Sequence, residues 1–340
     1  GEDCPGALQI VAPERVDVLL AGDAAAGEVE WLSEAQIAER LRHLREEPGA
    51  WREPDDPSQF SLAGAQPKTA LLLEDGRWGV PSGRTPTTHI LKPPVQEQYA
   101  GFAENEHVCL GLAAAVGLPA VRSRVMHFQE QPAIVVERFD RLRRGAGLIR
   151  LHQEDFCQAL GVLPQEKYEA DGGPGAPDLI RVLQERAVEP DVDVATMVGA
   201  LALNWVIGGT DGHAKNYAHL MQPGGTIRLA PLYDIISLLP YHEGRGPRVK
   251  LAMRIGGEYR MRYIARRHWE TLAATIGAGP EAVVAIVDEI AAQVPDHLTD
   301  VCRRVAEEGA GHPVLERMQT EITANARACR IRLAAKPNAG

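Results

Sequence analysis

The chain has 340 residues, a length that suggests about two domains of roughly 150 residues each. Hydrophobic residues make up 45% of it and charged residues 24%, the balance of a globular protein with a full-sized core, which excludes global disorder. The 36 Lys and Arg against 46 Asp and Glu give a formal charge of −10, which argues against wholesale electrostatic binding to DNA or to an anionic membrane.

The first part of the chain is expected to be mostly strands. Residues 1–60 form a connecting segment with one helix over 33–45, opened by a capping box between Ser33 and Gln36. Residues 61–140 form a β-rich lobe with a hairpin that turns at Asp75-Gly76. In this lobe the pattern predicts strands over 69–73, 78–80, 89–92, 121–127 and 133–139, and one helix over 102–116.

Residues 141–340 carry helical periodicity and are expected to form a larger, all-helical lobe. Helices are expected over 155–160, 178–186, 194–207, 267–276, 281–293, 297–308 and 314–332. The one strand-like interruption in this half covers 226–236. A small β-rich lobe followed by a helical one is an α+β bilobal arrangement, for which we expect a ligand cleft between the lobes.

The cysteines and the apolar stretches bear on localisation. Five dispersed cysteines without a Cys-x-x-Cys pair are typical of a reducing compartment rather than of a disulfide framework or a zinc site. The longest apolar stretches, 108–115 and 197–207, are too short or too interrupted to span a bilayer. We therefore expect a cytoplasmic protein that does not bind a membrane.

The most informative stretch is TDGHAKN, residues 210–216, which follows an apolar helix ending at Gly208-Gly209. Asp211 and Asn216 stand five residues apart, the spacing at which protein kinases place a catalytic base and a Mg²⁺ ligand. An Asx-rich turn that caps the helix would explain the same residues. His213 either hydrogen-bonds its neighbours, as turn histidines usually do, or contacts a ligand.

Asp234 stands in LAPLYDIIS, residues 229–237, at the end of an expected strand. Burying a lone carboxylate costs several kcal/mol unless it is paired or binds a metal. Together with Asp211 and Asn216 it makes an oxygen-ligand set suited to Mg²⁺. The alternative is an exposed aspartate that caps the next segment.

Two upstream features are suited to phosphate binding. SLAGAQPK, residues 61–68, is a loop of small residues that enters a strand, and its backbone amides can approach phosphate oxygens; a plain surface turn is the alternative. Lys92 ends an expected strand, where it either extends to solvent or reaches a phosphate. Glu104 or Glu106 of the following helix can hold this lysine in position, and Glu106 is the preferred partner.

These motifs together resemble those of the HipA family of bacterial serine/threonine kinase toxins. The resemblance rests on SLAGAQPKTALL, TPTTHILKP, VVERFDR, QEDFCQALG, YEADGGPG, TDGHAKN and LAPLYDIIS, which occur in this order. It implies a protein-kinase-like fold and transfer of phosphate from ATP, with Mg²⁺, to a protein serine. It also implies that the N-terminal subdomain of full-length members is absent.

The resemblance assigns a role to each candidate site residue. Asp211 is the catalytic base, with Lys92 and Asn216 as the other catalytic residues, and Asn216 and Asp234 bind the metal. Ser61 is the autophosphorylated serine. The residues expected to bind the nucleotide are Ala63, Gly64, Ala65 and Gln66 over the phosphates, Lys92, Glu137 and Phe139 at the adenine through their backbone, and His213.

The resemblance also implies partners. Family members pair with a small DNA-binding antitoxin, HipB, so that contact with DNA is indirect, and they phosphorylate aminoacyl-tRNA synthetases, with glutamyl-tRNA synthetase weakly preferred here. The segment between Lys92 and residue 102 is short for the family, which changes the surroundings of the phosphates. Two alternatives stay open: a kinase-like corepressor that binds antitoxin and DNA, and a small-molecule phosphotransferase.

Overall fold

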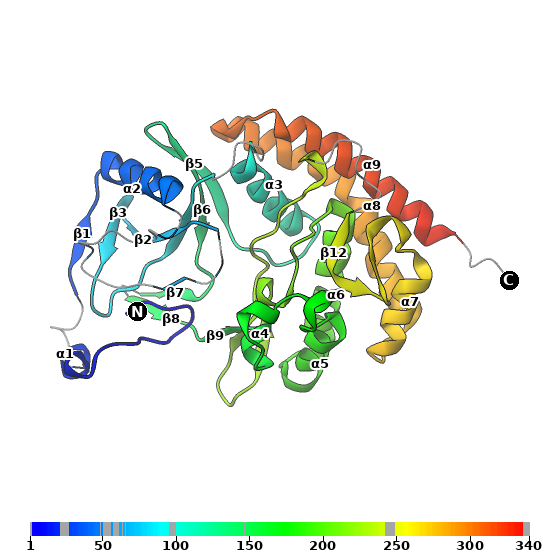
Figure 1. Cartoon of the computed structure of the whole chain (residues 1–340), viewed down its shortest axis with the longest axis horizontal. Coiled ribbons are helices and arrows are strands. Elements are labelled where there is room, and N and C mark those ends of the chain that lie inside the picture. The colour runs from blue at the N-terminus through cyan, green and yellow to red at the C-terminus, as the bar shows by residue number, and fades with distance from the viewer. Residues whose placement is uncertain are drawn as a thin grey trace. The chain divides into compact units, whose positions relative to one another are not determined.

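The computed structural model divides the chain into two compact units (Figure 1), one of residues 1–103 with 121–153 and one of residues 104–120 with 154–340. The structure describes residues 2–20, 27–47, 49, 56, 61–62, 64, 66–94, 100–145, 147–241 and 249–335.

The first unit is built on an antiparallel six-stranded sheet with the order β1-β3-β2-β4-β6-β5. The strands are β1 (Val29–Trp31), β2 (Thr69–Glu74), β3 (Arg77–Pro81), β4 (His89–Lys92), β5 (Ser123–Phe128) and β6 (Gln131–Glu137). The hairpin expected at Asp75-Gly76 is confirmed, because Leu73 pairs with Trp78 across it. Both turn residues have positive φ, as a tight two-residue hairpin requires.

Helix α2 (Glu34–Glu46) covers one face of this sheet (Figure 1). Its predicted capping box is confirmed: the Ser33 hydroxyl accepts from the Gln36 amide, and the Gln36 side chain accepts from the Ser33 amide. One stripe of the helix is buried against the strands. This core consists of Ile37, Ala38, Leu41 and Leu44 of α2 with Leu71, Trp78, Val80, Leu91, Phe128, Ala133 and Val135 of the sheet.

The boundaries of the first unit differ from the expected ones at both ends. Residues 1–60 do more than connect, because β1 and α2 are part of the sheet and its core. After Phe139 the chain forms a hairpin of β7 (Arg141–Arg144) and β8 (Gly147–Arg150), which also belongs to this unit. A three- or four-residue strand is too short for alternation to show in a sequence.

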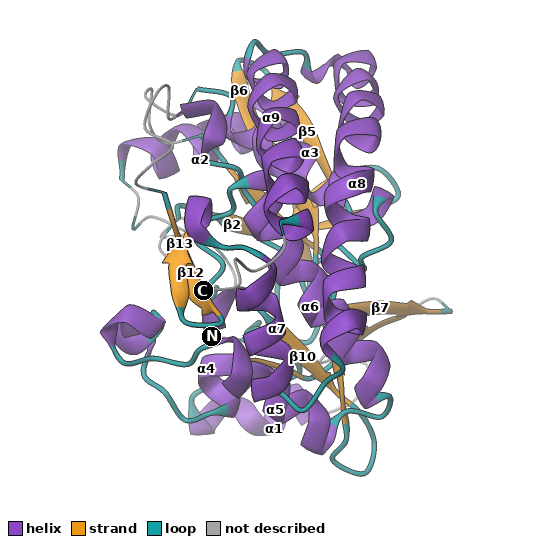
Figure 2. Cartoon of the chain, turned by 90° about the vertical axis from the view of Figure 1, so that its right-hand side faces the viewer, coloured by secondary structure: helices purple, strands orange, loops and turns teal. Residues whose placement is uncertain are grey.

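The second unit is mainly helical. Its helices are α3 (Phe102–Ala115), which starts at the boundary, α4 (Phe156–Ala159), α5 (Ala176–Arg186), α6 (Pro190–Ile207), α7 (Arg266–Thr275), α8 (Pro280–Val305) and α9 (Val314–Ala334). Helix α6 packs against α5, α8 and α9, and α8 runs along α9 (Figure 2). Helix α8 was expected as two helices. Pro295 lies inside it, and packing on α6 and α9 offsets the one backbone bond that a proline removes.

The expectation that this unit is all-helical is wrong. A three-stranded sheet joins β9 (Gln153–Asp155), β10 (Ala218–Met221) and β11 (Ile227–Leu229), and a hairpin joins β12 (Lys250–Ile255) to β13 (Glu258–Arg260). The strand expected over 226–236 is reduced to β11. Its neighbour β10 directly follows residues 210–216, so this small sheet anchors the most informative stretch of the sequence.

Two further features concern the expected compartment. Helix α6 has the length and mean hydropathy, 1.2, of a membrane span, but 61% of it is buried inside the protein, as in the core helix of a folded domain. All five cysteines are free and buried. Burial raises the pKa of the Cys302 and Cys329 thiols to about 11, so both stay protonated and unreactive at neutral pH.

Candidate active site

The segment 210–216 leaves helix α6 through two glycines that no other residue could replace without strain. Gly208 caps α6 in a left-handed conformation, with φ of 72°. The amide of Gly209 donates to the Asn204 carbonyl at 2.8 Å, and a β-carbon on Gly209 would overlap the Asn204 side chain. The direction of the chain after the helix is therefore fixed.

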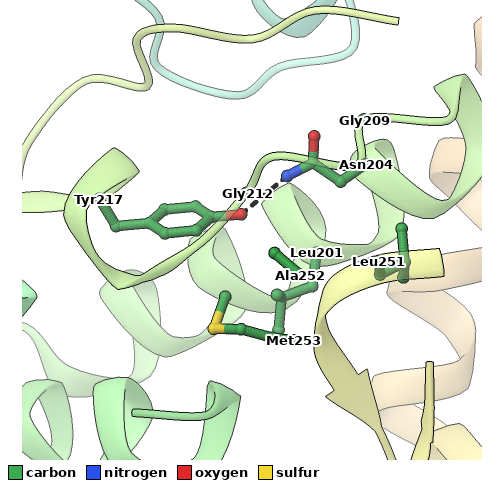
Figure 3. Close-up of a pocket in the computed structure, with 8 residues that line it drawn as sticks. All are labelled: Leu201, Asn204, Gly209, Gly212, Tyr217, Leu251, Ala252 and Met253. Atoms are coloured by element: carbon green, nitrogen blue, oxygen red, sulfur yellow. Dashed lines mark hydrogen bonds between the residues drawn. The ribbon is translucent and has the colours of Figure 1, made fainter. Parts of the chain in front are cut away.

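The Asn204 side chain also fixes the segment, through the Tyr217 hydroxyl (Figure 3). Its Nδ2 donates to the Tyr217 hydroxyl at 2.8 Å, and Gly212 passes so close that a β-carbon there would lie 2.7 Å from Nδ2. These residues line a small pocket with Leu201, Gly209, Leu251, Ala252 and Met253. The pocket is a gap beneath the segment, and its polar pair serves to hold the loop.

Within the segment, hydrogen bonds fix Asp211 and Asn216 to each other. Asn216 Nδ2 donates to the Asp211 carbonyl at 2.7 Å, and the His213 amide donates to the same carbonyl at 2.8 Å. Because the nitrogen of the Asn216 amide is engaged, Oδ1 is the atom it offers to a cation. The Asp211 side chain is 65% exposed, and the end of α6 is capped by Gly208 instead, which disfavours the alternative of a helix-capping turn.

His213 is only 3% exposed, and its Nε2 lies 3.8 Å from Asp211 Oδ1. Burial lowers the pKa of His213, against the opposing effect of Asp211, so we treat the imidazole as neutral at pH 7. A neutral ring packed beside the carboxylate supports Asp211 more directly than it serves a phosphate. The nucleotide contact expected of His213 stays a prediction.

Asp234 follows β11 and has a φ of 57°. The left-handed region costs a non-glycine residue about 1 kcal/mol, and strained residues cluster at functional sites. Its turn is fixed from both sides: the Tyr233 hydroxyl donates to the Lys215 carbonyl at 2.8 Å, and Ser237 exchanges two hydrogen bonds with Asn105 of α3. Asp234 also acts electrostatically on His213. The structure thus brings Asp211, Asn216 and Asp234 to one region of the second unit.

The sequence analysis missed an ion pair that fixes Lys215, a residue of this segment. Lys215 Nζ lies 2.6 Å from Asp155 Oδ2, and both side chains are largely buried. Asp155 also caps α4 through its bond from the Gln158 amide. Asp155 is the aspartate of the motif QEDFCQALG, but the sequence alone does not show that its partner is Lys215, 60 residues away.

The donor set of the expected metal site suits Mg²⁺. Asn216 and Asp234 offer amide and carboxylate oxygens, and Mg²⁺ prefers hard oxygen ligands and usually keeps waters or substrate phosphates in its shell. Among the described residues, no group of three or more His, Cys, Asp or Glu side chains is arranged to hold a metal. A site of two protein ligands, completed by phosphates, is consistent with both observations.

In the first unit, Lys92 ends β4 opposite Ile134 of β6 and is 6% exposed. The alternative that it extends into solvent is therefore wrong. Its expected role at the phosphates stays a prediction. Glu106, its preferred partner, is fully buried in α3, and the pairing itself stays a prediction.

The small-residue loop is described in part. Ala63 and Ala65 lie outside the described residues, Gln66 is half-buried and Ser61 is exposed. Gly64 has a φ of 105°, and the Lys68 ammonium lies so close to it that a β-carbon would overlap Nζ. Lys68 was not among the predicted site residues. The structure places its buried charge at the loop that is expected to cover the phosphates.

The stretch VVERFDR alternates between two environments. Glu137 is exposed and Phe139 half-buried, whereas Arg138 and Asp140 are buried. The two buried residues are paired: Arg138 Nη2 lies 2.9 Å from Asp140 Oδ2, and its Nη1 lies 3.1 Å from Asp3 Oδ2. The backbone expected to bind adenine is thus fixed by buried ion pairs that the sequence analysis did not identify.

The fold is protein-kinase-like. Its sheet-based unit carries a buried lysine and a small-residue loop, and its helical unit carries the Asp-x4-Asn segment and a further aspartate. The family model of the HipA-like C-terminal domain matches residues 60–298. The chain belongs to this family.

Individual proteins give the same result. The protein Y4mE of Sinorhizobium fredii is 39% identical over 82% of this chain and 65% of its own. The serine/threonine-protein kinase toxin HipA of Shewanella oneidensis is 28% identical over 78% and 63%. The chain therefore spans slightly less than two thirds of the length of these relatives.

Solved structures show the fold. HipA of Shewanella oneidensis, in complex with HipB and operator DNA, matches with a TM-score of 0.74 at 23% identity, over 89% of this chain and 72% of that one. The proinflammatory kinase CtkA of Helicobacter pylori matches with a TM-score of 0.50 at 11% identity, over 82% and 95%.

Proposed function

We propose that the chain is a serine/threonine protein kinase that uses ATP and Mg²⁺, with Asp211 as its base. One observation carries the proposal. The segment 211–216 presents an exposed carboxylate at Asp211, while the amide nitrogen of Asn216 is engaged in the loop and leaves its oxygen for a cation. The name of the Shewanella relative, a serine/threonine-protein kinase toxin, supports the same activity.

In the proposed reaction the hydroxyl oxygen of a serine forms a bond to the γ-phosphorus of ATP. The bond from that phosphorus to the bridging oxygen breaks, and ADP leaves. The serine proton passes to the Asp211 carboxylate. Lys92 holds the α- and β-phosphates, residues 63–66 cover the triphosphate, and the backbone of Glu137 and Phe139 binds adenine.

Mg²⁺, held by Asn216 and Asp234, supplies positive charge to the phosphates when it is bound. The chain itself contributes the rigid mounting of these two ligands. Asn216 is fixed through the Asp211 carbonyl, and the Asp234 turn is fixed through Tyr233 and Ser237. Such fixed positions need no rearrangement when charge develops in the reaction.

Asp211→Asn tests the assignment of the base. The variant should lower kcat for transfer of the γ-phosphate to protein by about 10²- to 10⁴-fold. Its melting temperature should not change, because the side chain is mostly exposed. Asp288→Asn is a matched control, since Asp288 forms an exposed pair with Arg330, which is worth little. Transfer at the wild-type rate in Asp211→Asn would contradict the proposal.

We also propose the biological setting. The chain is the toxin of a toxin–antitoxin pair, acts in the cytoplasm and binds a HipB-like antitoxin, through which it contacts DNA indirectly. The Shewanella structure, which contains HipA, HipB and operator DNA, supports this partner. Its substrate is an aminoacyl-tRNA synthetase, with glutamyl-tRNA synthetase the first to test. Phosphorylation of that enzyme by the wild type and not by Asp211→Asn is the expected result.

Autophosphorylation at Ser61 would switch the kinase off. Ser61 is exposed, and its amide donates to the Asp3 carbonyl at 3.0 Å. A phosphate there adds nearly two negative charges next to the loop that is expected to cover the phosphates of ATP. Repulsion between these charges would expel the loop and weaken nucleotide binding.

A further inference from the structure

The stretch YEADGGPG, residues 168–175, has no part in the proposed mechanism, yet it contacts the proposed base. The hydroxyl of Tyr168 donates to Asp211 Oδ1 at 2.7 Å, across 43 residues of sequence. The Tyr168 ring packs edge-on against the buried His213 ring, with centroids 4.9 Å apart. In the described part of the chain, these two residues are the polar neighbours of the Asp211 carboxylate.

Glycines fix the backbone that carries Tyr168. Gly172 has a φ of 93°, and a β-carbon on Gly173 would overlap the Glu166 carbonyl. The Gly173 amide donates to the Tyr168 carbonyl at 3.0 Å. The glycine pair is therefore required for this turn, and the turn sets the position of Tyr168.

A second contact anchors the turn to the body of the helical unit. The Glu169 carboxylate accepts from the backbone amide of Arg254, on β12, at 2.6 Å. Tyr168 is thus attached to a rigid strand through its neighbour, and to Asp211 and His213 through its own ring and hydroxyl. A tyrosine held in this way can restrict a carboxylate on an exposed loop.

The hydroxyl remains a donor across the working pH range. Burial, followed by the hydrogen bond to Asp211, raises the pKa of Tyr168 above its ordinary value of 10.0. A carboxylate that receives this bond on Oδ1 cannot rotate freely, and its Oδ2 is left for the hydroxyl of a substrate. Correct orientation of a reacting group can be worth about 10²-fold or more in rate.

We propose that Tyr168 is a positioning residue for phosphoryl transfer: its hydroxyl holds Asp211 Oδ1 and turns Oδ2 toward the substrate serine. The inference rests on the proposed function, since it assigns Tyr168 a role through Asp211. It requires that loss of the hydroxyl affects kcat and leaves ATP binding unchanged.

Tyr168→Phe removes the hydroxyl and keeps the ring on His213. Steady-state transfer from ATP with Mg²⁺ should show kcat lowered by about tenfold or more, with KM for ATP and the melting temperature unchanged. Tyr263→Phe is the matched control, because Tyr263 is exposed and its hydroxyl accepts from Arg262. An unchanged kcat in Tyr168→Phe, or a loss confined to KM, would overturn the inference.

A double-mutant cycle separates positioning from general damage. In the Asp211→Asn background, Tyr168→Phe should cause no further loss of the residual single-turnover rate, since the carboxylate that it orients is gone. Equal losses in both backgrounds would overturn the positioning role. If Asp211→Asn itself keeps the wild-type rate, the proposed function fails and the inference falls with it; if only Tyr168→Phe keeps it, the inference alone fails.

Discussion

Gly64 adopts a φ of 105°, and the ammonium of Lys68 lies directly against it. Both features depend on the missing side chain. A β-carbon would strain the backbone at this φ, and the end of the Lys68 side chain would have to move away from the loop. We infer that Lys68 contributes to holding the phosphates that this loop is expected to cover.

Gly64→Ala should raise KM for ATP by about tenfold, the loss expected for one hydrogen bond to a charged group. The matched control is Gly76→Ala at the β2–β3 turn. Gly76 has a φ of 76°, and a β-carbon there would meet no atom within 4 Å. Both variants should lose about 1 kcal/mol of stability, and only Gly64→Ala should weaken the binding of ATP. Equal KM values in the two variants would contradict this role.

At the scale of residues, residue type and spacing singled out Asp211, Asn216 and Asp234 as candidates, and the structure brings them to one region. The sequence could not identify Tyr168 or Lys68. Tyr168 contacts Asp211 from 43 positions away. Lys68 is a candidate because its side chain folds back onto the loop at Gly64. A contact that depends on the path of the backbone leaves no local pattern.

At the scale of elements, long amphipathic helices were predictable and short strands were not. Helix α2 has both a period and a start signal, so its position and capping box were predicted. Strands β1, β9 and β13 have three residues each, too few to establish a period of two. Helix α8 was divided at Pro295 because a sequence does not show the packing that tolerates a proline.

The cap of α2 gives a prediction about stability alone. Ser33→Ala should lower the free energy of unfolding by about 1 kcal/mol, because the Gln36 amide loses its acceptor. Thr271→Ala is the control: its hydroxyl donates within α7 to the Arg267 carbonyl and caps nothing. Chemical denaturation of both variants measures the difference, and equal unfolding free energies would show that the cap adds nothing.

At the scale of the whole molecule, distant segments of the first unit meet in a buried charge network. Asp3 pairs with Arg138, Arg141 and Arg150, and Asp140 pairs with Arg138 and Arg141. The network joins the N-terminal segment to the backbone that is expected to bind adenine. Breaking a buried pair leaves an uncompensated charge and costs about 3–5 kcal/mol.

The network predicts how stability depends on pH. Burial would raise the pKa of Asp3, but Arg138 and Arg141 outweigh it and hold this pKa below its ordinary value of 3.8. A carboxyl with a depressed pKa stabilises the fold above its unfolded-state pKa and loses that contribution as the pH falls through its folded-state pKa.

The melting temperature of the wild type should therefore drop below about pH 4. Asp3→Asn should have a lower melting temperature than the wild type at neutral pH. On acidification its melting temperature should fall by less, because it has one fewer carboxylate to protonate. Thermal melts of both proteins between about pH 3 and pH 7 measure this. Parallel curves would mean that Asp3 does not contribute through its charge.

The intact mass of the purified chain, before and after incubation with ATP and Mg²⁺, tests the central claim most directly. Asp211→Asn is treated in parallel, and both proteins are first dephosphorylated. We predict a gain of one phosphate that maps to Ser61 in the wild type and is absent from the variant. A wild-type chain that binds ATP and gains no phosphate, or a variant that gains it equally fast, would contradict the account of this chain as a kinase based on Asp211.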